Sequence, residues 1–140
     1  MNHVRLARLL ALIAGLLDLG VGLGLAILPS KVLPLMRVPL PAEQAQVYLR
    51  FVGAFVTAVG ASYLLALVRG GVAQLRNILE FTIPFRLAAG LFSGVAIACG
   101  WLALSWASVP VTDLAFIGIQ LWLLTKLQIP DVSSSSPSSV

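Results

Sequence analysis

The chain has 140 residues, of which 59% are hydrophobic and only 10% are charged, and its mean hydropathy is +1.01. A soluble domain of this size needs far more polar side chains to cover its surface, so the composition excludes a soluble protein and predicts an integral membrane protein. In a membrane protein, the net charge of +4 indicates orientation in the membrane and contact with anionic lipid headgroups. The sequence has no basic stripe with interleaved aromatic residues that would indicate a nucleic-acid partner.

The single cysteine and the single histidine restrict the available chemistry. Cys99 has no second cysteine to pair with, which excludes an intramolecular disulfide and a CxxC redox site. His3 stands alone near the N-terminus, so histidine-based catalytic triads and histidine-rich metal sites are excluded as well. We expect neither a metal ion nor another cofactor.

The first predicted helix covers residues 9–28, which are apolar apart from Asp18 near the middle. About 20 apolar residues at ~1.5 Å each span roughly 30 Å, the thickness of the hydrocarbon core of a bilayer. A carboxylate at that depth costs about 2.5–3.5 kcal/mol if lipid surrounds it. We therefore expect further helices to shelter Asp18.

Residues 29–41 contain four of the eight prolines. That density predicts a loop without regular helix. The apolar residues between the prolines favour a loop along the membrane interface, with Lys31 and Arg37 at the headgroups, although a solvated connector is an alternative. Pro41 is predicted to be the first residue of the second helix, which crosses the membrane over residues 51–68 and is broken by Gly70 and Gly71.

The second half of the chain predicts two further spans. Residues 72–81 are expected to form a short interfacial helix, and Pro84 to kink the start of a third span that ends near residue 104. The fourth span covers residues 110–127. The prediction is an all-α transmembrane four-helix bundle formed by residues 1–129, followed by a disordered serine-rich tail over residues 130–140.

The distribution of basic residues predicts the orientation. The side of the membrane that would hold both termini has six basic residues, Arg5, Arg8, Arg69, Arg76, Arg86 and Lys126, and the opposite side has three, Lys31, Arg37 and Arg50. The excess favours both termini in the cytoplasm, and we expect the membrane to be a bacterial inner membrane.

Each predicted helix has polar or small residues on one face, and such faces mark helix contacts in lipid. On the first helix this face contains Ala11, Ala14, Gly15, Asp18 and Gly22. On the second it contains Arg50, Ala54, Thr57 and Ala61, with Gly53 and Gly60 next to it. On the third it contains Thr82, Arg86, Gly90, Ser93 and Gly94, and on the fourth Asp113, Ile117, Gln120 and Leu124. Two GxxxG motifs, at residues 20–24 and 90–94, are explained by packing within one chain and equally permit a homodimer.

The inward polar groups form the predicted site. The expected ligand-binding residues are Asp18, Thr57, Tyr63, Arg86, Ser93, Asp113 and Gln120. Arg50 and Asp113 fall at the same membrane depth and are predicted to form an ion pair. A buried polar network that only fixes the register of the helices is the alternative, and snorkelling to the headgroups is the alternative for Arg50 and Arg86.

Four segments carry a resemblance to a known family: AILPSKVLPL after the first helix, LRFVGAFVTAVGASYLLAL, PFRLAAG and PVTDLAFIGIQLWLL. Over residues 6–127 this pattern resembles the small four-helix membrane proteins of the DoxX-like families. The resemblance implies a fold rather than an activity. A more distant similarity is to sterol-isomerase-type membrane domains, whose catalytic positions do not match this chain residue by residue.

Three functions compete. The first is binding of a small or lipidic ligand, or of a membrane partner, in the polar interior. The second is an enzyme acting by proton transfer on a hydrophobic substrate, with Asp18 as acid or base and Arg86 or Asp113 as electrostatic support. The third is a proton-coupled exporter of small molecules that uses Asp18, as the similarity in size to small multidrug resistance proteins suggests.

Overall fold

The computed structural model describes residues 2–127, so the tail predicted for residues 130–140 lies outside the described residues. The elements in chain order are α1 (His3–Ile27), α2 (Pro29–Leu35), α3 (Glu43–Arg69), α4 (Val72–Ala98), the 3-10 helix η1 (Leu104–Ala107) and α5 (Ser108–Lys126). The described residues contain no strand, and four helices are long and apolar enough to cross a membrane. This confirms the all-α four-helix bundle.

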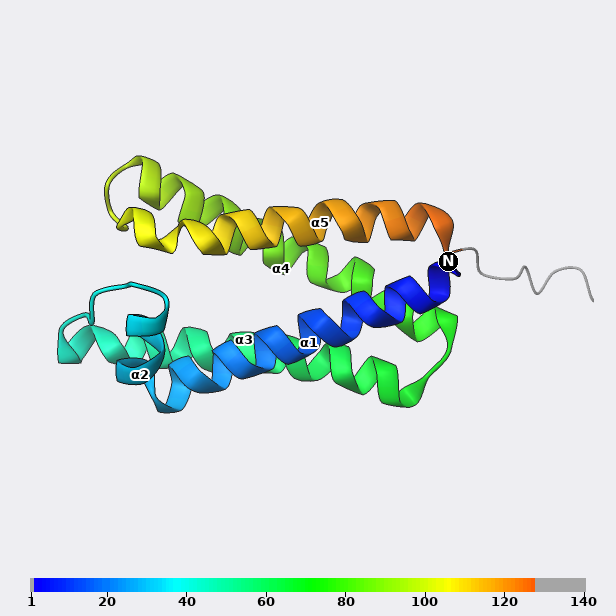
Figure 1. Ribbon diagram of the computed structural model, residues 1–140, viewed down its shortest axis with the longest axis horizontal. Coiled ribbons are helices and arrows are strands. Elements are labelled where there is room, and N and C mark those ends of the chain that lie inside the picture. Colours follow the sequence, from blue (N-terminus) through cyan, green and yellow to red (C-terminus); the bar gives the residue numbers. More distant parts are fainter. Residues whose placement is uncertain (1, 128–140) are drawn as a thin grey trace, which may run out of the picture.

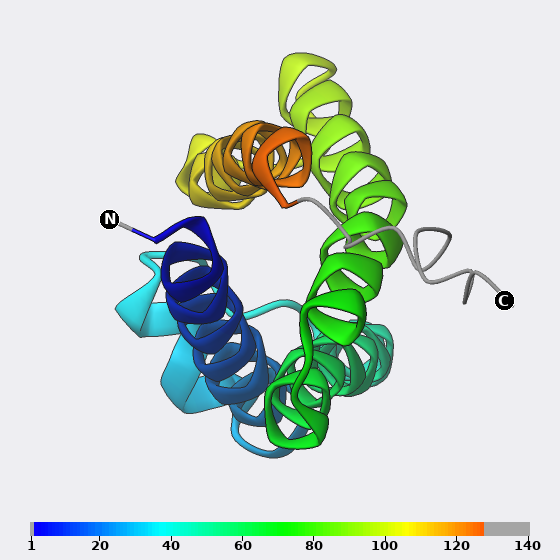
Figure 2. The same ribbon diagram turned by 90° about the vertical axis from the view of Figure 1, so that its right-hand side faces the viewer.

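The helices form two antiparallel pairs that lie side by side (Figure 1). α1 packs chiefly against α3, and α4 packs chiefly against α5. Viewed from the end that holds the N-terminus and the end of α5, the four helices surround a common centre (Figure 2). The first two spans therefore form one pair and the last two form the other.

Glycines bring α1 and α3 close together. Gly15 and Gly22 on α1 and Gly53 and Gly60 on α3 are all buried. A Cβ atom on Gly60 would overlap the backbone of α1 at Leu19, so only glycine fits there. Close backbone contact of this kind is the usual basis of helix association in lipid, where burial of apolar surface adds little.

This contact corrects one predicted face. The face predicted for α1 is buried throughout, but on α3 Ala54 and Ala61 are exposed and the buried residues are Gly53, Gly60 and Tyr63. The difference follows from size, because the glycine row lets the α1 backbone approach more closely than an alanine row would.

The two helix pairs share an apolar core mainly at the end of the bundle that holds the N-terminus. Leu10 of α1, Leu79 of α4 and Leu123 of α5 meet there in one cluster. A smaller cluster at the opposite end joins α1 to α2 through Leu25 and Leu33. α5 has no buried residue between positions 108 and 119. The pairs are therefore closed together at one end and less tightly packed at the other.

The prediction of a helix-free segment after α1 is wrong in its first half. Pro29–Leu35 is helical, because Pro29 occupies the first helical turn, where its missing N–H is not needed. Pro34 lies near the end of this short helix, and the fully buried Leu33 anchors it against α1. The second half, which contains Pro39, is not helical, and α3 begins at Glu43 rather than at Pro41.

The short interfacial helix predicted for residues 72–81 is also wrong, because α4 runs without interruption through Val72–Ala98 and ends before the predicted residue 104. Leu75 and Leu79 are buried in the shared core, and Arg76 donates hydrogen bonds to Glu80 and to the carbonyl of Leu127. The two buried leucines and the hydrogen bond to Leu127 hold the segment against the bundle. Pro84 lies inside α4, which transmembrane helices tolerate.

The break between α3 and α4 is as predicted. Gly70 and Gly71 have φ angles of 70° and 85°, in a region that favours glycine. The start of the fourth span also agrees, since α5 begins at Ser108, within two residues of the predicted Pro110.

Candidate functional site

A polar cluster lies between the two helix pairs and receives side chains from all four long helices. We call it the polar cluster, and its members are Asp18 of α1, Tyr63 of α3, Thr82 and Arg86 of α4, and Asp113 and Gln120 of α5. All of them are buried except Asp113, which is half-buried. The cluster thus connects the α1–α3 pair to the α4–α5 pair in a region where few other contacts connect them.

Arg86 is the centre of the cluster. Its Nη2 lies 2.6 Å from Asp18 Oδ2, and its Nη1 lies 2.8 Å from Asp113 Oδ1. Its Nε donates a longer hydrogen bond of 3.4 Å to the Tyr63 hydroxyl. The planar guanidinium offers donors in a fixed fork, so one side chain can bind groups from three other helices. Its charge also lies 4.4 Å from the centroid of the Phe116 ring, a cation–π contact.

Tyr63, Thr82 and Gln120 form the uncharged end of the cluster. The Tyr63 hydroxyl and Thr82 Oγ1 are 2.6 Å apart, and Gln120 Nε2 donates to both oxygens. Thr82 Oγ1 also donates to the carbonyl of Ile78, so its hydrogen is used within α4. Gln120 Oε1 is buried and has no hydrogen-bond partner among the described residues. This end is sealed, and it contains one unmatched acceptor.

The charged end is more accessible. The side chains of Asp18 and Asp113 are 10% and 13% exposed, whereas Tyr63 and Gln120 are fully buried. Two carboxylates face one guanidinium, so the cluster carries one excess negative charge when both acids are ionised. Asp113 belongs to the part of α5 that has no buried residue. The carboxylates are therefore the most exposed part of the cluster.

Five of the seven predicted ligand-binding residues come together in the cluster: Asp18, Tyr63, Arg86, Asp113 and Gln120. The other two do not join its hydrogen bonds. The Thr57 hydroxyl donates to the carbonyl of Gly53 at 2.8 Å, and the Ser93 hydroxyl donates to the carbonyl of Ala89 at 2.6 Å. Both hydroxyls are satisfied within their own helix. A catalytic role for Asp18 and Arg86 stays a prediction.

The predicted Arg50–Asp113 ion pair is wrong. Arg50 Nη1 donates to the carbonyls of Ala26 and Ile27 at 2.8 and 3.2 Å, at the C-terminal end of α1. The last carbonyls of a helix have no partner within it, and α3 packs directly against α1, so these carbonyls are the nearest acceptors. Asp113 lies in the other helix pair and is bound by Arg86.

Two contributors are absent from the predicted ligand-binding residues. Thr82 stands four residues before Arg86, and this spacing predicts it on the same inward face, but the predicted ligand-binding residues do not include it. Phe116 is three residues after Asp113, but nothing in the sequence distinguishes it from the many other apolar residues of α5. Its contact with Arg86 depends on how the helices cross.

The described residues contain no group of three or more His, Cys, Asp or Glu side chains that could hold a metal ion. Comparison of the chain with family models, with curated proteins and with solved structures finds no match. The geometry of the polar cluster and its position in the bundle are therefore the basis for assigning a function.

Proposed function

We propose that the chain is an integral membrane protein that binds a hydrophobic or lipidic ligand with a cationic group at the charged end of the polar cluster. The observation that supports this most is the pairing of two carboxylates, Asp18 and Asp113, with the single guanidinium of Arg86. We also propose a bacterial inner membrane, both termini in the cytoplasm and membership of the DoxX-like families.

The charge balance explains the choice of ligand. An excess buried negative charge is unfavourable in a membrane unless a proton or a cation neutralises it. An ammonium group beside Asp18 and Asp113 would neutralise the cluster without displacing Arg86. The apolar part of the ligand would lie between the two helix pairs, next to the part of α5 that has no buried residue. The accessible carboxylates and this loosely packed region are contiguous because Asp113 belongs to both.

The test uses n-decylamine, a slender hydrophobic cation at neutral pH, and n-decanol, its uncharged analogue of equal chain length. We expect decylamine, at a concentration 100 times its Kd, to raise the free energy of unfolding of the detergent-solubilised protein by about 2.7 kcal/mol. Decanol should have a much smaller effect. The test variants are Asp18→Asn and Asp113→Asn, which keep the shape of each side chain and remove its charge.

The difference between the two probes excludes the contribution of general partitioning into the micelle. Each variant should reduce this difference. Equal stabilisation by decylamine and decanol, or a decylamine effect that survives in both variants, would contradict the proposal.

The same charge balance favours a second candidate, a proton-coupled exporter. With one carboxylate in excess, a proton and an organic cation can occupy the charged end alternately. Decylamine binding would then release a proton in a weakly buffered solution that contains a pH indicator, and the release would be lost in the Asp18→Asn variant. Binding without proton release supports the first candidate alone.

A further inference from the structure

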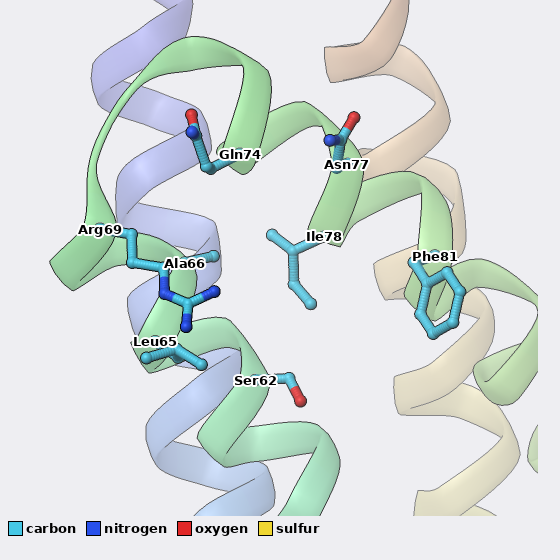
Figure 3. Close-up of a pocket in the computed structure, with 8 residues that line it drawn as sticks. All are labelled: Ser62, Leu65, Ala66, Arg69, Gln74, Asn77, Ile78 and Phe81. Atoms are coloured by element: carbon cyan, nitrogen blue, oxygen red, sulfur yellow. The ribbon is translucent and has the colours of Figure 1, made fainter.

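A second site, which is lined by both polar and apolar residues, lies away from the polar cluster, between the end of α3 and the start of α4 (Figure 3). It is an open groove of about 400 Å³, within the size range of small-molecule sites. We call it the α3–α4 groove, and the residues that line it are Ser62, Leu65, Ala66, Arg69, Gln74, Asn77, Ile78 and Phe81. None of these residues takes part in the polar cluster.

The polar residues of the groove lie next to the loop between α3 and α4. Arg69 ends α3, and Gln74 and Asn77 lie in the first two turns of α4. Figure 3 shows the Arg69 guanidinium beside Ala66 and Leu65, on the α3 side of the groove. Among residues 2–127, ion pairs are made by Arg76 and Arg86 but not by Arg69. The groove therefore has a cation and two amides where transmembrane helices reach the headgroups.

The apolar residues of the groove lie farther along the helices. Leu65 is one turn before Arg69, and Ile78 and Phe81 are one and two turns after Gln74. Leu65 and Phe81 are exposed, at 49% and 68%. These positions lie toward the middle of two membrane-spanning helices, at the depth of acyl chains. Ser62 also lines this end, but its hydroxyl donates to the carbonyl of Ala58 in its own helix. The lining thus changes from mainly polar to mainly apolar away from the loop, as a phospholipid does.

We propose that the α3–α4 groove binds one anionic phospholipid, with its phosphate and polar glycerol region among Arg69, Gln74 and Asn77, and the start of an acyl chain against Leu65, Ile78 and Phe81. The charge of Arg69, which no ion pair within residues 2–127 compensates, favours an anionic lipid over a zwitterionic one. This site is independent of the function proposed for the polar cluster.

The test measures lipid binding to the full chain in detergent by native mass spectrometry. The probes are phosphatidylglycerol and phosphatidylcholine with identical acyl chains. We expect the first phosphatidylglycerol to bind more tightly than phosphatidylcholine, and Arg69→Gln to weaken the binding of phosphatidylglycerol about fivefold. Arg5→Gln is the matched control, because it removes an exposed cation at the same end of the bundle but outside the groove, and it should have little effect.

A second variant tests the apolar part of the groove. Phe81→Ala should weaken the binding of both lipids, whereas Arg69→Gln should act on phosphatidylglycerol alone. Millimolar inorganic phosphate should not displace the bound lipid if the acyl chain contributes. Equal affinity for the two lipids, equal effects of Arg69→Gln and Arg5→Gln, or full displacement by inorganic phosphate would overturn the proposal.

Discussion

Arg86 shows why one residue type suits the centre of this bundle. Its guanidinium reaches Asp18, Asp113 and Tyr63 at the same time, each on a different helix. A lysine has three donors on a single nitrogen and could not match the same fork of acceptors. Removing one partner of a buried ion pair is strongly unfavourable, since it leaves the other charge uncompensated. Arg86 is thus a structural contact between the helix pairs as well as part of the proposed binding site.

Tyr63 offers a test of the cluster that leaves its charges in place. Tyr63→Phe removes the hydroxyl that Thr82, Arg86 and Gln120 contact. We expect the free energy of unfolding to fall by about 1–3 kcal/mol, because buried polar groups lose a partner. The measurement is equilibrium unfolding in mixed micelles, followed by tryptophan fluorescence.

The matched control for this variant is Tyr48→Phe. Tyr48 is 75% exposed, so loss of its hydroxyl should leave the free energy of unfolding nearly unchanged. Equal effects of the two substitutions would mean that the Tyr63 hydroxyl contributes nothing to the cohesion of the cluster.

At the scale of elements, the bundle combines two kinds of helix contact. Within the α1–α3 pair the contact is backbone against backbone at glycines, and between the pairs it is polar side chains and a one-ended apolar core. Close packing of this kind has no tolerance for added volume, whereas the interface between the pairs depends on a few specific polar groups. We therefore expect the contact within the α1–α3 pair to be more rigid than the contact between the two pairs.

Two glycine substitutions test this difference. Gly60→Ala places a Cβ atom against the backbone of Leu19, so α1 and α3 must separate, and we expect a loss of about 1–3 kcal/mol in the free energy of unfolding. Gly20→Ala is the control, since nothing lies within 4 Å of the added atom and alanine favours helix more than glycine. The same unfolding measurement compares the two, and a larger loss at Gly20 would refute the assignment of the contact.

At the scale of the whole molecule, the even number of spans puts the N-terminus and the end of α5 at one end of the bundle (Figure 1). Arg5, Arg8, Arg69, Arg76 and Lys126 lie toward that end, and Lys31 and Arg37 lie at the other. Arg50 donates to the carbonyls at the end of α1 and Arg86 pairs with buried carboxylates, so both contribute less to orientation than a simple count assumes. The remaining bias is the basis for the proposal that both termini are cytoplasmic.

The single cysteine provides a direct measurement of this orientation. Cys99 is exposed and follows the last residue of α4, at the end opposite the termini. We expect a membrane-impermeant maleimide to label it in intact cells. In a Cys99→Ser background, Asn2→Cys should be labelled only after the membrane is permeabilised. The reverse pattern would place both termini outside.

The sequence alone determined the membrane location, the four spans and most of the polar site, because hydropathy and helical spacing are properties of each segment by itself. The buried face of α1 followed from its small residues and Asp18, and the break at Gly70 and Gly71 followed from their composition. Spacing along one helix cannot specify which face of another helix it meets. Only the tertiary structure decided that Asp113 binds Arg86 while Arg50 caps α1, because those contacts depend on which helices pair and how closely their glycines let them approach.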